Sequence, residues 1–149
     1  MNLDETTLKV LRVNLQREEG FREFVYNDEL GIPSIGYGRN LHDVGISMPE
    51  ALDLLNKDIA RADFDASHFF PWYTNLDEAR KYVFAAMVFQ LGVGRVKGFA
   101  NFLAFLEKGQ YVNAAEEMLN SEWARQTPAR VKRLAEVLKS GVLPTIAVP

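Results

Sequence analysis

A short stretch near the N-terminus, EEGFREFVYNDELGIPSIGYG at residues 18–38, decides the fold class of this chain. Upstream of it, leucines recur at spacings of three and four, which predicts a helix over residues 4–19 that stops at Gly20. Beyond Gly20 the period changes, and short β-type pieces alternate with turn residues such as Leu30-Gly31. A small, irregular sheet of two or three short strands is therefore expected to follow the first helix.

Most of the chain beyond residue 46 has helical periodicity. Ser47 and Glu50 have the spacing of a capping box, which predicts a long helix running to about residue 66. Residues 75–78 repeat the capping pattern ahead of 79–91, a stretch that is apolar nearly all round, as in a buried central helix. Further helices are expected at about 99–107, 112–120 and 128–139, the last of them capped by Thr127.

These elements predict an α+β chain that is mostly helical and consists of two lobes. The sheet-bearing lobe is expected over about residues 14–60. The helical lobe is expected over about residues 67–149 together with the N-terminal helix, and the long helix joins the two lobes. A chain of 149 residues suffices for one such domain but not for two independent ones.

Composition excludes several classes of protein. The absence of cysteine excludes a disulfide framework, a thiol nucleophile and a Cys-based zinc site. With only two histidines, His42 and His68, no metal or cofactor is expected. The longest apolar run, residues 83–89, is far shorter than the roughly 18 residues that span a bilayer, and the polar N-terminus does not resemble a signal peptide. A soluble protein made in a cytoplasm is therefore expected.

Charge is unevenly distributed along the chain. The net charge of −3 divides into −6 for residues 1–70 and +3 for residues 71–149. Neither half has a basic run dense enough to predict nucleic-acid binding. The asymmetry indicates different surroundings for the two ends, although an ordinary solvated surface remains an alternative.

Three residues near the N-terminus have side chains suited to hydrolysis. Glu19 ends the first predicted helix, where the negative end of the helix dipole and neighbouring carboxylates favour the protonated form that a general acid requires. Asp28 follows in the first turn of the sheet region, and Ser34 lies on the next strand. The spacing Glu-x8-Asp-x5-Ser allows an acid, a carboxylate and a hydroxyl to surround one cleft. Because each residue is also common at such a position for structural reasons, the spacing alone leaves both interpretations open.

The residues around this triplet favour one interpretation. Glu19-Gly20, Tyr26-x-Asp28 and the PSIGYG segment at 33–38 resemble the active-site segment of phage lysozymes of the T-even type, glycoside hydrolase family 24. The resemblance covers about half the chain and follows the family's order. It resumes in MVFQLG at 87–92, GFAN at 98–101 and WARQTPARVKR at 123–133.

This resemblance implies a two-lobed, largely helical lysozyme-like fold whose cleft binds bacterial peptidoglycan. It implies hydrolysis, with inversion, of the β-1,4 bond between N-acetylmuramic acid and N-acetylglucosamine. Glu19 would be the general acid, Asp28 would orient the attacking water and stabilise positive charge on the sugar, and Ser34 would hold that water. Ser34 stands where most relatives have threonine, so the hydroxyl is kept and the methyl that restricts its rotamer is lost.

Further site residues are implied by the same resemblance. Phe89 and Gln90 match cleft-facing positions, and Arg130 matches an arginine across the cleft from the acid, so these three are the expected substrate-binding residues. Core packing for Phe89 and a solvated position for Arg130 remain alternatives. Arg39 stands where many relatives have a histidine that pairs with an aspartate on the long helix, which predicts an Arg39–Asp58 ion pair.

The chain is thus expected to be a phage or prophage endolysin, a monomeric enzyme with no metal, cofactor, nucleic-acid partner or stable membrane association. It would stay in the host cytoplasm until a holin-type membrane-permeabilising protein releases it to the cell wall in the periplasm. Three alternatives remain open: a lytic transglycosylase, which needs only Glu19, a non-catalytic wall-binding module, and a virion-borne lysozyme used at entry.

Overall fold

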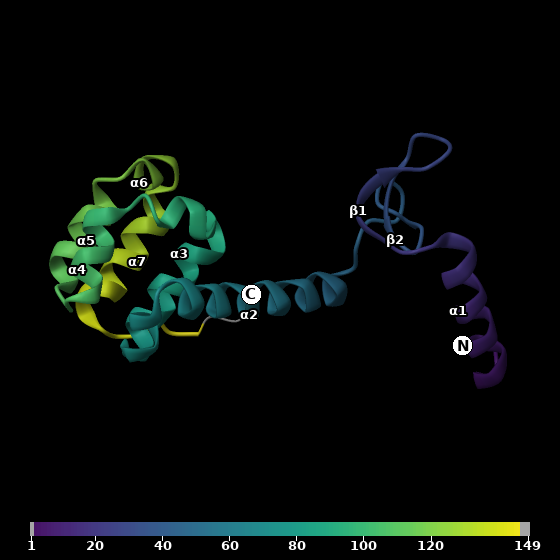
Figure 1. Cartoon of the computed structure of the whole chain (residues 1–149), viewed down its shortest axis with the longest axis horizontal. Helices are drawn as coiled ribbons and strands as arrows, with labels where there is room; N and C mark the ends of the chain where they lie inside the picture. Colours follow the sequence, from purple (N-terminus) through teal and green to yellow (C-terminus); the bar gives the residue numbers. More distant parts are fainter. Residues whose placement is uncertain (1, 147–149) are drawn as a thin grey trace. The chain divides into compact units, whose positions relative to one another are not determined.

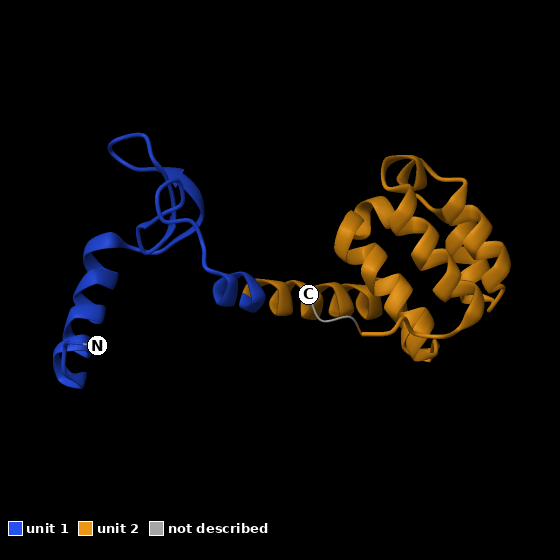
Figure 2. Ribbon diagram, turned by 180° about the vertical axis from the view of Figure 1, so that it is seen from behind, with its two compact units in different colours: residues 1–53 blue, residues 54–149 orange. Residues whose placement is uncertain are grey.

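The computed structural model describes residues 2–146, which form seven α-helices, one 3-10 helix and three strands (Figure 1). The prediction of a mostly helical α+β chain is confirmed. The chain divides into two compact units, residues 1–53 (unit 1) and residues 54–149 (unit 2), and the boundary falls within α2, Met48–Phe69 (Figure 2). Unit 1 contains the N-terminal helix, so its expected packing with the helical lobe stays a prediction.

Unit 1 begins with α1, Glu5–Glu19, whose start and end follow from local hydrogen bonds. The Asp4 carboxylate accepts a hydrogen bond from the backbone N–H of Thr7 at 2.7 Å, which satisfies one of the free donors of the first turn. Gly20 ends the helix in a left-handed conformation with φ of 69°. No residue of α1 is buried, so its leucine stripe has no packing partner among the described residues of unit 1.

The predicted small sheet is confirmed as three antiparallel strands in the order β1-β2-β3, at Arg22–Asn27, Pro33–Gly36 and Arg39–Asn40. Ser34 on the central strand is the register partner of Tyr26 on β1 and of Asn40 on β3. Antiparallel partners directly opposite each other project to the same face, so Ser34 and Asn40 share one face of the sheet. The sheet therefore fixes which polar groups surround Ser34.

The start of α2 is tied to the sheet by an ion pair that the sequence analysis assigned differently. Arg39 donates to both carboxylate oxygens of Glu50, at 2.5 and 3.2 Å, and to the backbone oxygen of Gly45 at 3.0 Å. The predicted Arg39–Asp58 pair is wrong, because Asp58 pairs with Arg61 on its own helix. Glu50, the capping-box glutamate, is close enough to β3 for its two carboxylate oxygens to bind the Arg39 guanidinium. This explains why Arg39 pairs with Glu50.

Unit 2 contains the apolar core, which surrounds α3, Glu78–Val96. Phe84 of this helix is completely buried, and its ring lies 5.1 to 6.4 Å from the rings of Phe70, Trp72 and Phe102. The other elements of unit 2 are η1, Pro71–Asn75; α4, Ala100–Glu107; α5, Tyr111–Leu119; α6, Glu122–Gln126; and α7, Pro128–Ser140. The prediction of a buried central helix is confirmed.

Several predicted helix boundaries shift for local reasons. The capping box of α2 is confirmed, since Ser47 and Glu50 exchange backbone-to-side-chain hydrogen bonds at 2.7 and 3.3 Å. The cap of α3 is Asp77, which bonds to the backbone N–H of Arg80 at 3.0 Å, rather than a residue two positions earlier. Thr127 precedes α7 but makes no side-chain capping bond to that helix. The short helix α6 was not predicted, because five residues give too little periodicity.

Among the residues that the structure describes, no helix is both long and apolar enough to cross a bilayer.

The capping box should make the stability of the chain depend on pH in acid. Hydrogen bonds from the backbone N–H of Ser47 and from Arg39 lower the pKa of Glu50 from 4.5 to about 2. Because the folded-state pKa lies below the ordinary value, this contribution is present above about pH 4.5 and is lost as the pH falls toward about 2. We therefore expect the melting temperature of the parent chain to fall more steeply between these pH values than that of Glu50→Gln.

Thermal unfolding followed by circular dichroism across this pH range checks the prediction. Glu107→Gln, which changes an exposed glutamate outside the network, is the matched control and should keep the slope of the parent. Equal slopes for the parent and Glu50→Gln would contradict the assigned role.

Candidate active site

Glu19 is the last residue of α1, and its exposed carboxylate lies against the turn between β2 and β3. A glycine makes this approach possible. A Cβ atom added to Gly38 would lie 2.7 Å from Oε2 of Glu19, closer than Cβ atoms approach other groups. Gly38 also has a φ of 79°, a conformation that other residues rarely adopt. Gly38 is therefore required by its backbone conformation, and a side chain at this position would displace the Glu19 carboxylate.

Asp28 closes the turn that joins β1 to β2. Its Oδ1 atom accepts hydrogen bonds from the backbone N–H groups of Leu30 and Ile32, at 2.8 and 2.9 Å. Its own backbone N–H donates to the carbonyl of Ile32 at 2.9 Å. No partner for the second carboxylate oxygen, Oδ2, occurs among the described residues. The two donors hold the carboxylate in one orientation and leave one oxygen to accept from a ligand or a water.

Ser34 is only 2% exposed. Among the residues that the structure describes, it is the one polar residue that is buried. Its hydroxyl donates to the carbonyl of Ile32 at 3.2 Å, the same carbonyl that accepts from the backbone N–H of Asp28. This distance is at the long end for an O–H···O hydrogen bond, which indicates a weak one. The backbone of Ile32 is thus the shared partner of Asp28 and Ser34.

The three predicted catalytic residues all lie in unit 1. Asp28 and Ser34 are joined through one backbone residue, and Glu19 lies against the turn that follows the strand of Ser34. Within residues 2–146, no hydrogen bond joins any two of the three side chains directly. An acid, an oriented carboxylate and a hydroxyl without mutual contacts can act on a substrate and a water placed among them.

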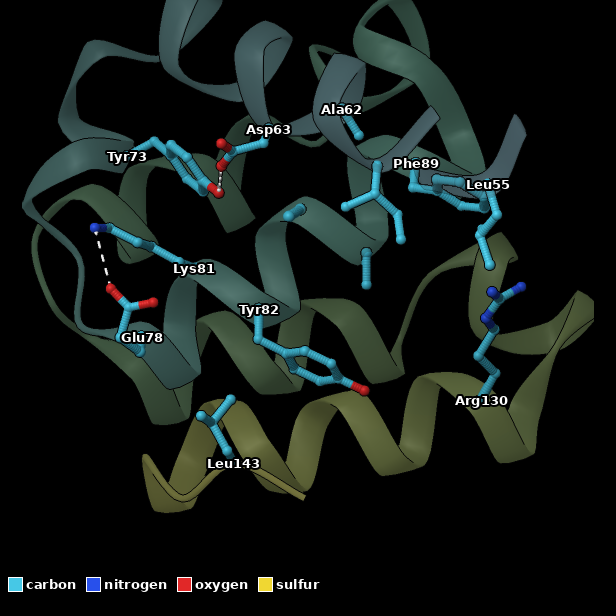
Figure 3. A pocket seen from close by; sticks show the side chains of 13 residues that line it. Leu55, Ala62, Asp63, Tyr73, Glu78, Lys81, Tyr82, Phe89, Arg130 and Leu143 are labelled. Carbon is cyan, nitrogen blue, oxygen red and sulfur yellow. Dashed lines mark hydrogen bonds and ion pairs between the residues drawn. The ribbon is translucent and has the colours of Figure 1, made fainter. Parts of the chain in front are cut away.

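The predicted substrate-binding residues lie in unit 2, where two of the three line one groove (Figure 3). The groove has a volume of about 680 Å³, and Phe89 and Arg130 point into it beside Leu55. Gln90 does not line the groove, and its carboxamide oxygen is buried without a hydrogen-bond partner among the described residues. The other lining residues are mostly apolar: Ile59, Ala62, Tyr82, Ala85, Ala86 and Leu143.

The polar side chains at the far end of this groove are paired with one another. The Tyr73 hydroxyl donates to Asp63 at 2.5 Å, and Lys81 lies 3.4 Å from Glu78. Burial, together with the neighbouring Asp63 carboxylate, raises the pKa of Tyr73, so its hydroxyl stays protonated and remains a donor. Within the described residues of unit 2, Arg130 makes no ion pair.

Gly38 is the site residue whose role the sequence analysis did not identify, although it belongs to the quoted motif. The signal was a second glycine two residues after the first, at the end of a predicted strand. Among residues 2–146, no three or more His, Asp or Glu side chains form a cluster able to hold a metal ion.

Comparison with known proteins identifies the family of this chain. The model of the family described as phage lysozyme matches residues 16–137. Two proteins of Dictyostelium discoideum, probable T4-type lysozymes 1 and 2, are 44% and 42% identical over 71 residues, which are 48% of this chain and 42% of each relative. The pre-baseplate central spike protein Gp5 of Enterobacteria phage T4 is 28% identical over 162 residues, 90% of this chain and 28% of that protein.

The chain therefore spans less than half the length of these curated relatives. The family match, in contrast, extends over most of the chain and includes Glu19, Asp28, Ser34 and Gly38 together with the groove residues Phe89 and Arg130. On this basis the chain belongs to the phage lysozyme family.

Proposed function

We propose that this chain is a glycoside hydrolase, a lysozyme that cleaves the β-1,4 bond between N-acetylmuramic acid and N-acetylglucosamine in peptidoglycan. The observation that carries the proposal is the placement of the Glu19 carboxylate against Gly38, in the unit that also contains Asp28 and Ser34. Membership of the phage lysozyme family supports the same reaction class.

Glu19 is assigned the role of general acid. It donates its proton to the glycosidic oxygen as the bond to the sugar breaks and positive charge develops on the ring. The contact with Gly38 supports this role, because a side chain held against backbone has fewer rotamers to lose when substrate binds.

Asp28 and Ser34 are assigned to the attacking water. Oδ1 of Asp28 is occupied by two backbone donors, which leaves Oδ2 to accept a proton of the water and to face the positive charge of the sugar. The Ser34 hydroxyl makes only a long bond to Ile32, so it is free to turn toward that water. Attack on the face opposite the acid gives inversion of the anomeric carbon.

Phe89, Gln90 and Arg130 are proposed to bind substrate. The ring of Phe89 is 41% exposed, a suitable surface for the apolar face of a sugar. The guanidinium of Arg130, which lines the groove, suits a carboxylate of the wall. For Gln90 the buried oxygen leaves the amide nitrogen as the group that would donate to a sugar.

The biological role proposed for this activity is that of an endolysin. It would act as a monomer, without metal or cofactor, and would reach the wall from the host cytoplasm with the help of a holin-type protein. The match to a phage baseplate spike protein favours a second candidate, a lysozyme carried by the phage particle. The two roles share the chemistry and differ in whether the protein is found in purified particles.

Product analysis tests the reaction. We expect mass spectrometry of digested peptidoglycan to find reducing N-acetylmuramic acid ends, and Glu19→Gln to lower their rate of formation by about 10²- to 10⁴-fold because the proton donor is lost. Digestion in heavy-oxygen water should place the label in the new reducing end. Products with 1,6-anhydro ends would instead identify a lytic transglycosylase, and sedimentation with the wall without any product would identify a binding module.

The contact between Gly38 and Glu19 gives a second prediction. Gly38→Ala should lower activity by about tenfold or more, because the new methyl displaces the Glu19 carboxylate and a misplacement of 1 Å is costly to catalysis. Gly36→Ala is the matched control, since Gly36 has a φ of 69° and an added Cβ there meets nothing within 4 Å.

Both substitutions strain the backbone, by roughly 1–2 kcal/mol each, so both should lower the melting temperature similarly. Rates measured on soluble wall fragments, at a temperature where all three proteins are folded, separate the two effects. Equal activities of the two alanine variants would show that the Glu19 contact does not matter.

The assignment of α1 to the helical lobe is also a proposal. The helix has no buried residue, although Leu11 and Leu15 continue an apolar stripe along it and are 43% and 46% exposed. If this stripe packs in the folded protein, Leu11→Ala should lower the free energy of unfolding by about 2 kcal/mol or more. Arg12→Ala, on the next position of the helix, should change it by less than about 0.5 kcal/mol. Urea unfolding of both variants checks this, and equal small effects would contradict the assignment.

A further inference from the structure

The C-terminal half of α2, which belongs to unit 2, has a row of rings on its outer face. Ala62 and Ala66 of this helix are buried in the core. Positions 64 and 68 each lie two residues further along, about 200° round the helix, so they project away from the core. Phe64 and His68 are exposed there, and Phe69 at the end of the helix is exposed as well. These three residues are called the aromatic row below.

The rings of the aromatic row pack on one another. Those of Phe64 and His68 are stacked, with centroids 5.6 Å apart and 9° between their planes, and the ring of Phe69 meets His68 edge-on at 4.9 Å. Phe64 is 63% exposed and Phe69 is 44% exposed, whereas the next residue, Phe70, is buried and packs against Phe84. Single exposed apolar residues are ordinary on a protein, but a contiguous exposed set marks an interaction site.

Three polar groups border the aromatic row. Lys97, which follows α3, holds its ammonium group 4.6 Å from the centre of the Phe69 ring, in a cation–π contact. Asp65 precedes His68 by three residues and Phe69 by four, so it lies on the same side of the helix. Within the part of the chain that the structure describes, the side chains of Asp65, His68 and Lys97 form no hydrogen bond or ion pair. The border thus provides a donor, an acceptor and an imidazole that can be either.

This combination of groups suits a sugar. The face of an aromatic ring is negative and attracts the C–H groups on the face of a pyranose, while the hydroxyl and acetamido groups at the edge of the sugar need donors and acceptors. A helix that lies on a lipid surface instead has a wide apolar face that includes leucine as well as aromatic residues. On this face of α2 the positions beside the rings are occupied by Arg61 and Asp65.

The charge beside the rings narrows the class of sugar polymer. Peptidoglycan combines sugar rings with carboxylates, which are present on the lactyl groups or on the peptide stems attached to them. An exposed cation next to exposed rings complements such a strand, and Lys97 lies in the half of the chain whose net charge is +3.

We propose that the aromatic row and Lys97 form a second binding surface for the glycan strands of peptidoglycan, which holds the enzyme on the wall between cleavage events. The proposal rests on the proposed function, because it takes peptidoglycan as the substrate. None of these residues lines the groove of Phe89 and Arg130, and none is assigned to catalysis. Attachment at one surface raises the effective concentration of the polymer at the other and leaves the chemistry there unchanged.

The two histidines of the chain allow this surface to be observed directly. NMR spectra of the imidazole C–H groups would be recorded while soluble glycan strands, freed of their peptide stems, are added to the Glu19→Gln variant. We expect the His68 signals to shift and to saturate, because a sugar stacked on the row changes the environment of the middle ring. His42→Gln assigns the two sets of signals. Unchanged His68 signals throughout the titration would overturn the proposal.

Sedimentation with insoluble peptidoglycan measures what the row contributes. In the Glu19→Gln variant, adding Phe64→Ala together with Phe69→Ala should weaken binding to the wall by about tenfold, in line with the loss of one or two aromatic contacts. Val112→Ala is the matched control, since Val112 is 59% exposed on another helix of unit 2, and it should keep the affinity of the parent. Equal affinities of the double variant and the control would overturn the proposal.

The same variants distinguish two other occupants of the surface. Vesicles that contain anionic lipid and sedimentation equilibrium of the protein alone are the two measurements. Binding to vesicles that depends on the rings, with unchanged binding to the wall, would identify a membrane surface. Self-association that depends on the rings, again with unchanged binding to the wall, would identify a contact between copies of the chain. Either result would overturn the proposal.

Cleavage separates this proposal from the function on which it rests. In the chain with native Glu19, the double alanine variant should raise KM for the insoluble wall without lowering kcat, because the row has no contact with the reacting bond. If the native chain cleaves no peptidoglycan while wall binding still depends on the rings, the proposed hydrolysis fails and the aromatic row keeps its assignment. A fall in kcat with unchanged KM would overturn that assignment instead.

Discussion

The hydrogen bonds around Ile32 are the interaction on which unit 1 depends. The N–H of this residue donates to the Asp28 carboxylate, and its carbonyl accepts from the Asp28 backbone N–H and from the Ser34 hydroxyl. A substitution at Asp28 therefore opens the turn between β1 and β2 as well as removing a proposed catalytic group. The same carboxylate has a structural oxygen and a free oxygen, so a loss of activity at this position must be interpreted together with stability.

The two units are stabilised by different forces. Unit 2 buries large apolar side chains around Phe84, and each contributes about 1.5–3 kcal/mol by leaving water. In the described part of unit 1, Ser34 alone is buried, while Phe24 and Leu30 are 77% and 84% exposed. Unit 1 relies on turn hydrogen bonds and the Arg39–Glu50 pair, and a typical hydrogen bond contributes only about 0.5–1.5 kcal/mol. Taken by itself, the unit that holds the proposed acid is therefore stabilised mainly by polar contacts.

The wrong partner for Arg39 shows how a pattern misleads at long range. Glu50 was identified as a capping-box residue, and that local role is confirmed, yet its carboxylate also reaches the strand. The spacing of residues in the sequence does not predict this second contact. A cap involves only four neighbouring residues, whereas the ion pair joins residues eleven positions apart. The substrate-binding set divides for a similar reason. Phe89 and Arg130 line one groove, whereas Gln90 is not among its lining residues, since neighbours on a helix differ in direction by about 100°.

Four features were predictable from the sequence alone: the fold class, most of the helices from their caps and apolar periods, the small sheet, and the family motif that contains Glu19, Asp28 and Ser34. These features depend on hydrogen bonds and periodicities within a few residues, which a sequence records directly. The tertiary structure was needed to show that Gly38 makes room for the Glu19 carboxylate and that Ile32 joins Asp28 to Ser34. Each of these depends on side-chain direction and on contacts between separate elements, and neither is encoded in spacing along the chain.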